Sequence, residues 1–156
     1  MTKIDNFHGY YSWLSNFSPA QISLDGEAYP SVEHAYQAAK SNDIDVRKSI
    51  QQMPTAAQAK KVGKLVEIKK DWDLVKLDIM LGLLRQKFQN LELKQQLVDT
   101  GDAELIEGNW WGDVFWGVCN GIGENNLGKL LMKIRGEINV VYSGRTVEAG
   151  SNKESL

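Results

Sequence analysis

An acid, an amide and an amine recur at helical spacing early in the chain, as Glu33, Gln37 and Lys40. The surrounding segment 31–40 predicts a short helix, with the Ser31 hydroxyl capping its first free N–H groups. Side chains three or four positions apart share a helix face, so the three polar groups line up. Such a row can serve an active site, with a carboxylate base beside an amine. It can equally be an ordinary solvated face.

A second chemically dense segment, 107–117, combines glycines and carboxylates with three tryptophans. Tryptophan rings offer faces for stacking a heterocycle, and glycines let the backbone approach a ligand closely. The alternative is a satellite hydrophobic cluster under a loop. That alternative accounts poorly for Asp113, because an unpaired buried charge is costly. Packed among Trp rings, Asp113 would favour its protonated form and act as an acid.

A third candidate is the segment 121–129, which opens the last predicted helix under an Asn125 or Asn126 cap. Free N–H groups and the helix dipole at such an end favour an anion such as phosphate. A plain capped helix is the alternative. Lys129 and Arg135 could also meet phosphate or ribose, although Arg135 lies deep in the helix and could instead pair with a structural acid.

Metal and cofactor chemistry are not expected. The two histidines and one cysteine have no ligand spacing. His34 is expected to make a structural hydrogen bond at a helix start. Cys119 has no neighbour that would stabilise a thiolate, so we expect a small buried side chain.

The helices and strands that must position these groups can be predicted from the sequence. Together they indicate a mostly helical α+β single domain with a small β-sheet. Asp25-Gly26 suits the turn of a hairpin over 21–29, and 7–17 reads as strand or loop. Apolar residues at helical period in the longest helix are Leu74, Leu77, Met80 or Leu81, and Leu84 or Phe88. Further helices are expected over 31–40, 55–63 under a Thr55 cap, 72–88 under an Asp71 cap, 91–98 and 127–138, with a strand at 104–107. The domain spans 1–142, and a polar, mobile tail spans 143–156.

Composition narrows the class of protein. The chain has 156 residues, a formal net charge of −2 and one cysteine. It has no apolar run near the ~20 residues of a membrane span and no signal-peptide pattern, so a cytoplasmic location is expected. Duplex DNA binding through a basic face is disfavoured, because such binding depends on phosphate neutralisation. A small anionic ligand needs only a local positive charge.

The motifs together resemble the NADAR, or YbiA-like, family over about 7–138. The resemblance rests on their order: Leu14-Ser15-Asn16-Phe17, Ser31-x-Glu33-His34-x-x-Gln37-x-x-Lys40, Met80 through Lys87-Phe88, Leu105-x-Glu107, Asp113-x-x-Trp116-Gly117, Gly123-x-Asn125-x-Leu127-Gly128 and Leu131-Met132-x-x-Arg135. The chain departs from the family pattern at 118–120, and at Ser41, where an aromatic often follows the motif lysine.

The resemblance implies an N-glycosidase. Bacterial members hydrolyse ribosylamino-pyrimidine phosphates of the early riboflavin pathway, and other members remove ADP-ribose from guanine bases. By position, the family's catalytic residues correspond to Glu33 and Asp113, with Lys40 as a contested third. The substrate-binding residues implied are Asn16, Phe17, Gln37, Trp72, Trp116, Gly117, Asn125 and Gly128.

Two mechanisms follow for cleaving a ribosyl C1–N bond. Paired carboxylates can stabilise the cationic sugar or activate water and manage the leaving group. Alternatively, the Lys40 amine attacks the opened sugar to form a Schiff base. We favour the carboxylates. The expected partner is a small phosphorylated N-riboside or an ADP-ribosylated base. Competing readings are an ADP-ribosyl-guanine hydrolase, a non-catalytic ADP-ribose or NAD binding module, and a purely structural partner protein.

Overall fold

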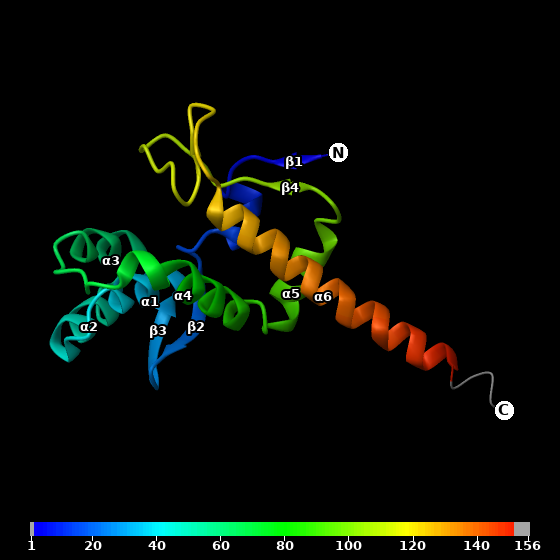
Figure 1. Cartoon of the computed structure of the whole chain (residues 1–156), viewed down its shortest axis with the longest axis horizontal. Helices are drawn as coiled ribbons and strands as arrows, with labels where there is room; N and C mark the ends of the chain where they lie inside the picture. The colour runs from blue at the N-terminus through cyan, green and yellow to red at the C-terminus, as the bar shows by residue number, and fades with distance from the viewer. Residues whose placement is uncertain (1, 152–156) are drawn as a thin grey trace. The chain divides into compact units, whose positions relative to one another are not determined.

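Figure 1 shows the computed structural model, which describes the backbone of residues 2–151 and the side chains of residues 2–144. The chain forms two compact units. The central unit is Phe7–Asn90, and the terminal unit combines the first residues, through Asn6, with the chain from Leu91 onward. Helices and three two-stranded sheets make up the described part, which confirms the α+β class.

The central unit contains the predicted hairpin. Strand β2 (Pro19–Leu24) pairs antiparallel with β3 (Glu27–Ser31). The turn residues Asp25 and Gly26 have φ values of 49° and 83°. Positive φ at both positions is what a tight turn of this kind requires, and Gly adopts it without steric cost. The Asp-Gly signal is therefore confirmed.

Helix α1 (Val32–Ala39) contacts the hairpin and the helices α2 (Ile44–Gln51), α3 (Ala56–Gly63) and α4 (Trp72–Lys87), as can be followed in Figure 1. The Ser31 hydroxyl accepts the His34 backbone N–H at 3.1 Å, and Thr55 forms a capping box with Gln58, so both predicted caps are confirmed. Every residue of α1 is buried. The reading of its polar row as a solvated face is therefore wrong.

Four points of the predicted central unit need correction. The segment predicted as strand or loop contains a 3₁₀ helix, η1 (Gly9–Leu14). Helix α2 was not predicted; the Asp43 carboxylate caps it by accepting backbone N–H groups of Asp45 and Val46. Leu74 and Leu77 are 84% and 40% exposed, because the buried stripe of α4 runs through Trp72, Met80, Leu83, Leu84 and Lys87. Asp71 stands at the N-cap of α4 but makes no side-chain cap bond.

The terminal unit pairs short strands from distant segments. Strand β1 (Lys3–Ile4) runs parallel to β4 (Glu104–Leu105), which is shorter than the strand predicted at 104–107. Strand β5 (Gly108–Asn109) runs parallel to β6 (Val118–Cys119). Helix α5 (Leu91–Asp99) contacts the long helix α6 (Asn126–Ser151).

Helix α6 is longer than the sequence predicts. It continues past 138, the predicted end, through Ser151, and so includes most of the segment expected to be a polar tail. The remaining tail residues, 152–156, lie outside the described residues. Among the helices of the described part, none is both long and apolar enough to span a membrane.

Candidate functional site

The first candidate site is built on the buried face of α1. Glu33 and Gln37 are only 7% and 4% exposed, and the Gln37 Nε2 donates a hydrogen bond to the Glu33 Oε1 at 2.7 Å. Glu33 lies in the first turn of α1, where the helix dipole favours a carboxylate anion. Its backbone N–H donates to the Asn16 carbonyl at 3.1 Å. The structure thus fixes the carboxylate from both its side chain and its backbone.

The Asn16–Phe17 turn lies beside the start of α1. Asn16 is buried, and its Nδ2 lies 3.5 Å from the Met80 Sδ. The Asn16 Oδ1 and the Gln37 Oε1 are buried acceptors for which no donor is found among the described residues. A buried acceptor without a donor costs about 1–3 kcal/mol. A ligand that donates from hydroxyl or amino groups would satisfy both, which supports the predicted substrate contacts of Asn16 and Gln37.

Lys40, at the end of α1, is half-buried, with its Nζ 5.6 Å from the centroid of the Tyr36 ring. Burial lowers the pKa of Lys40 below its ordinary value. The Glu33 charge opposes this shift, whereas the positive charges of Lys60, Lys64 and Lys76 reinforce it. The Lys40 amine is therefore deprotonated more readily than an exposed lysine.

The pKa of Lys40 should respond to its neighbours in opposite directions. Glu33→Gln removes the charge that raises this pKa, so the pKa should fall further; Lys60→Ala should raise it. The measurement is the Lys40 ¹³Cε chemical shift over about pH 7 to 11. Lys61→Ala, at an exposed position of the same helix, should leave it unchanged. A rise in Glu33→Gln would contradict this electrostatic account.

Two aromatic residues form one wall beside Lys40. Trp72 is 5% exposed, and its ring centroid lies 5.1 Å from that of Tyr36 at an interplanar angle of 53°. The Lys69 Nζ lies 6.0 Å from the Trp72 centroid. Trp72 therefore supports Tyr36 from within the core, and its predicted stacking on a base stays a prediction.

Phe17 is more exposed to solvent than Trp72. Its side chain is 42% exposed, and the Lys60 Nζ lies 5.8 Å from the centroid of its ring.

Helix α3 approaches α1 closely at Gly63. A Cβ at this position would overlap the Gln37 side chain. Gly63→Ala should displace the Gln37 amide from Glu33 and destabilise the protein by about 1–3 kcal/mol, as overpacking does. Urea denaturation measures the change. Gly82→Ala in α4 is the matched control: its Cβ would meet nothing within 4 Å, and alanine there should stabilise by up to about 1 kcal/mol. Equal midpoints for the two variants would refute the close contact.

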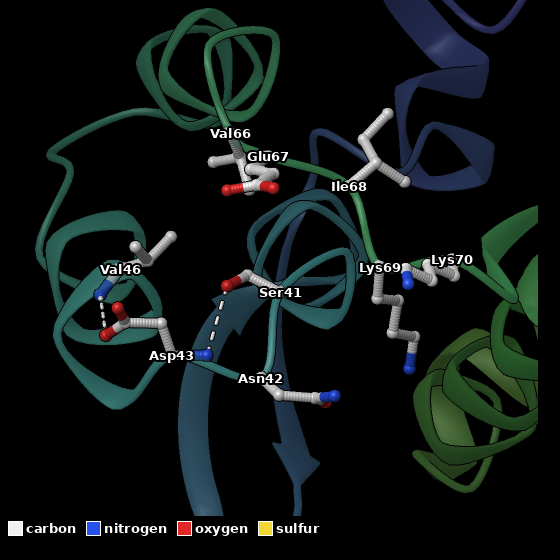
Figure 2. A pocket seen from close by; sticks show the side chains of 9 residues that line it. All are labelled: Ser41, Asn42, Asp43, Val46, Val66, Glu67, Ile68, Lys69 and Lys70. Carbon is white, nitrogen blue, oxygen red and sulfur yellow. Dashed lines mark hydrogen bonds between the residues drawn. The ribbon is translucent and has the colours of Figure 1, made fainter.

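A pocket of about 300 Å³ lies past the end of α1. Figure 2 shows the side chains that line it. The Ser41 Oγ faces it and accepts the Asp43 backbone N–H at 3.0 Å. The Lys69 N–H donates to the Lys40 carbonyl at 2.9 Å, which ties the rim to α1. Its lining residues are Ser41, Asn42, Asp43, Val46, Val66, Glu67, Ile68, Lys69 and Lys70. The sequence did not indicate this pocket, since two segments some twenty residues apart, 41–46 and 66–70, form it.

The second candidate site lies in the terminal unit, where Asp113 orders a turn. Its Oδ1 accepts the backbone N–H groups of Phe115 at 3.2 Å and Trp116 at 2.9 Å. Asn109 brackets the same turn by donating to the Asp113 carbonyl and accepting its N–H. Asp113 is half-buried and its Oδ1 is occupied by these two N–H groups, and its predicted role as a proton donor stays a prediction. The half-buried Trp116 packs edge-on against Phe115, with ring centroids 4.9 Å apart.

Asn125, Gly117 and Gly128 hold the framework of that unit. Asn125 has a φ of 55°, and its amide accepts the Glu107 N–H at 3.0 Å and donates to the Leu105 carbonyl at 2.9 Å. A Cβ at Gly128 or Gly117 would overlap a backbone carbonyl. These contacts give Asn125, Gly117 and Gly128 structural roles. Their predicted part in substrate binding stays a prediction.

Four further residues are placed by their contacts or exposure. His34 is buried; its Nδ1 lies 2.6 Å from the Ser31 Oγ and its Nε2 lies 2.9 Å from the Met53 carbonyl, which confirms its structural role. Arg135 is buried and donates to the Thr100 Oγ1 at 2.8 Å, which is a structural hydrogen bond to a hydroxyl group and not the predicted pairing with an acid. Lys129 is exposed, and Cys119 is half-buried instead of buried as expected.

The sequence reasoning missed the lysines around Lys40. Lys60 is on α3, Lys64 is the C-cap residue that follows it, and Lys76 is on α4. Their only sequence signal is helical spacing in a lysine-rich stretch, which ordinary exposed helices share. Only the folded arrangement shows that their charges act on Lys40.

The fold has a solved counterpart. The NMR structure of the Escherichia coli protein YbiA matches with a TM-score of 0.80 and 34% sequence identity, covering 91% of this chain and 89% of that one. Fold and site together thus define an α+β protein of the YbiA type, with a buried carboxylate and a half-buried lysine in the polar row of α1.

Sequence comparisons agree with the structural match. The NADAR domain family model matches residues 5–139, and the chain belongs to that family. N-glycosidase YbiA of Escherichia coli (strain K12) is 36% identical over 132 residues, covering 82% of each chain. N-glycosidase Npun_R5314 of Nostoc punctiforme is 38% identical over 140 residues, covering 85% of this chain and 89% of that one.

The name of one longer relative refers to a biosynthetic pathway. Riboflavin biosynthesis protein VVA0006 of Vibrio vulnificus is 38% identical over 138 residues, which is 86% of this chain but only 36% of that protein. The relatives that match over most of their own length are named N-glycosidases, and this chain is an enzyme of the same glycosyl hydrolase class.

Proposed function

We propose that this N-glycosidase hydrolyses the ribosyl C1–N bond of a phosphorylated ribosylamino-pyrimidine, an early intermediate of riboflavin synthesis. The observation that carries the proposal is the buried Glu33 carboxylate, which Gln37 fixes and whose charge acts on the half-buried Lys40. The name of the Vibrio relative supports the pathway. The cytoplasmic location stays a prediction.

Glu33 supplies the chemistry that this bond needs. Breaking the C1–N bond builds positive charge on the ribose, which an adjacent carboxylate stabilises. In the hydrolytic route, a water oxygen bonds to C1 and gives one proton to Glu33. The departing nitrogen keeps the bonding pair and takes a proton from the second carboxyl group or from solvent, and Glu33 afterwards returns its proton to solvent. The acceptor atoms Asn16 Oδ1 and Gln37 Oε1 suit the ribose hydroxyl groups.

Asp113 stays the candidate for the second carboxylate, with its Oδ2 as the chemically relevant oxygen because Oδ1 holds the turn. Asparagine keeps an acceptor for both N–H groups and removes the charge. Asp113→Asn therefore separates a chemical role from a role in turn geometry. Among the stacking candidates, Trp116 is the more accessible of the two predicted tryptophans.

A second route through Lys40 has its own support. The lowered pKa of Lys40 makes its amine a better nucleophile near neutral pH than an ordinary lysine. In this route the sugar ring opens to an imine between C1 and the base nitrogen, the Lys40 amine adds to C1, and the base nitrogen leaves as an amine. A Lys40 imine remains, and water hydrolyses it to release the sugar and restore the lysine. Borohydride would reduce and trap the imine as a stable sugar adduct on Lys40.

A second substrate class also fits the lysine charges. A diphosphate carries more negative charge than one phosphate, so an ADP-ribosyl group on guanine is the alternative substrate. A binding module for ADP-ribose or NAD is the non-catalytic alternative, although binding an anion gains nothing from the buried Glu33 carboxylate.

A product assay tests the proposed function. The intact protein is incubated with a phosphorylated ribosylamino-pyrimidine, its dephosphorylated riboside, an ADP-ribosylated guanine oligonucleotide and NAD. Mass spectrometry then identifies the released base and sugar. We expect release of ribose phosphate from the first compound. Turnover of the oligonucleotide alone would favour the second class, and binding of ADP-ribose with no turnover of any compound would overturn the enzymatic proposal.

A further inference from the structure

We propose that Met80 of α4 is a positioning residue of the site, because its sulfur fixes which way the Asn16 amide faces. Asn16 then offers an oxygen to the substrate, and the site selects a group that donates a hydrogen bond there, as a ribose hydroxyl does. The inference rests on the proposed function for the ribose. The contact between Met80 and Asn16 does not depend on that function.

Backbone contacts fix the place of the turn that carries Asn16. The Asn16 carbonyl accepts the Glu33 N–H at 3.1 Å. Lys87, which belongs to the same buried stripe of α4 as Met80, donates to the Ser15 carbonyl at 2.8 Å. These contacts hold the turn against the start of α1. They do not decide which end of the Asn16 amide faces a ligand.

The Met80 sulfur decides this orientation. The two ends of an amide have nearly the same size, so the hydrogen-bond partners must distinguish them. The Asn16 Nδ2 lies 3.5 Å from the Met80 Sδ, and a thioether sulfur can accept a hydrogen bond but has no hydrogen to donate. With the amide reversed, the Asn16 oxygen would face the sulfur and no hydrogen would lie between them. Met80 and Asn16 are 1% and 8% exposed, so water competes poorly for this contact.

The favoured orientation leaves the Asn16 Oδ1 as the end of the amide that needs a donor. None is found for it among the residues that the structure describes, and a buried acceptor without a donor is costly. The next residue, Phe17, is 42% exposed, so this turn reaches the surface where a ligand can approach. An amide oxygen accepts hydrogen bonds and donates none. It therefore favours a hydroxyl or amino group and disfavours a phosphate oxygen.

The neighbouring Glu33 has the same preference. An ionised carboxylate accepts hydrogen bonds only, and the backbone contact between Glu33 and Asn16 keeps the two residues together. Acceptors at both positions match the hydroxyl-bearing part of a sugar and repel its phosphate. The orientation that Met80 imposes on Asn16 thus extends the acceptor character of the site beyond the carboxylate.

NMR tests the contact without any substrate. Met80→Leu removes the sulfur at nearly constant volume, which cores usually tolerate. The side-chain ¹⁵N–¹H signals of Asn16, identified by their loss in Asn16→Asp, should shift because the Nδ2 has lost its acceptor. Met132→Leu, the same replacement on α6, should leave these signals unchanged. If Met80→Leu does not fold, replacing the methionines by norleucine exchanges the sulfur for a CH₂ group and gives the same test. Unchanged Asn16 signals would contradict the contact.

Calorimetry tests the selection of a donor. The probes are ribose 5-phosphate and its 2-deoxy and 3-deoxy analogues. One of the two analogues should bind the wild type about 10-fold more weakly than ribose 5-phosphate, because it leaves the buried Asn16 oxygen unpaired. In Met80→Leu, ribose 5-phosphate should bind more weakly and this ratio should approach one. In Met132→Leu, the ratio should stay at the wild-type value, and the urea midpoint establishes that both variants are folded.

Three results overturn the selection. The first is no binding of ribose 5-phosphate to the wild type. The second is equal affinity of the wild type for all three sugars, which would show that solvent serves the Asn16 oxygen. The third is a ratio that stays at the wild-type value in Met80→Leu.

These failures are distinguishable from failure of the proposed function. A hydroxyl preference that depends on Met80, with no turnover of any riboside, supports the assignment and rejects the reaction. Turnover of the phosphorylated riboside with no effect of Met80→Leu on the ratio rejects the assignment alone.

Discussion

Replacing Glu33 by glutamine should lower kcat/KM about 10²- to 10⁴-fold, the range expected when a general base is lost. Glutamine keeps the length of the side chain and an oxygen that can accept the Gln37 Nε2 hydrogen bond. The negative charge is the main property removed. Because the carboxylate is held in a buried site, water screens its lost charge poorly, and the effect should appear in kcat more than in KM.

The control for Glu33→Gln is Glu67→Gln, which removes an exposed carboxylate on the rim of the pocket. Its kcat/KM should match the wild type. Circular dichroism and the urea midpoint establish that both variants are folded. A Glu33→Gln enzyme that keeps wild-type kcat/KM would remove Glu33 from the chemistry, and a borohydride adduct on Lys40 would then point to the Schiff-base route.

Replacing Lys87 by alanine should destabilise the protein by about 2–4 kcal/mol, from the cavity left by the side chain and the loss of its hydrogen bonds. Lys87 is 2% exposed, and its Nζ donates to the Ser15 carbonyl at 2.8 Å and to the Ser18 Oγ at 2.9 Å. These bonds fasten the turn that carries Asn16 and Phe17. Without the ammonium group, the half-buried Ser15 carbonyl loses this donor and keeps those of Ser18.

Lys87→Met separates the two contributions. Methionine fills most of the same volume but donates no hydrogen bond, so it should recover the packing part of the loss only. Activity of both variants, measured where they are still folded, should fall because Asn16 and Phe17 are held less firmly. Lys70→Ala, at an exposed lysine, should leave the urea midpoint unchanged. A wild-type midpoint for Lys87→Ala would contradict the anchoring role.

The elements that the sequence predicted correctly have local causes. The Ser31 and Thr55 caps and the Asp-Gly turn depend on side chains within three residues of the backbone groups they satisfy. Helix α2 escaped prediction because its only marked signal is the Asp43 cap. The length of α6 was underestimated because its polar last turns look like a tail.

The site was harder to predict because its environment is set by distant segments. The row of Glu33, Gln37 and Lys40 was visible from spacing, but its burial depends on three other helices and a hairpin. Helix α3 approaches this row closely only because Gly63 has no side chain where it meets Gln37. A pattern of hydrophobic residues predicts that a lysine such as Lys87 lies on the surface. Its burial could not be predicted, because the two groups that accept its hydrogen bonds lie some seventy residues earlier in the chain.

The pairing of β1 with β4 bears on the order in which the chain can fold during its synthesis. The central unit is continuous from Phe7 to Asn90, so all its contacts become available once that stretch has left the ribosome. Strand β1 emerges first but aligns Lys3 with Glu104, so it must wait for a partner made about a hundred residues later. Since domains generally fold as units during synthesis, the first residues should be the last to find their place. A bulky amino-terminal fusion would interfere at that late step.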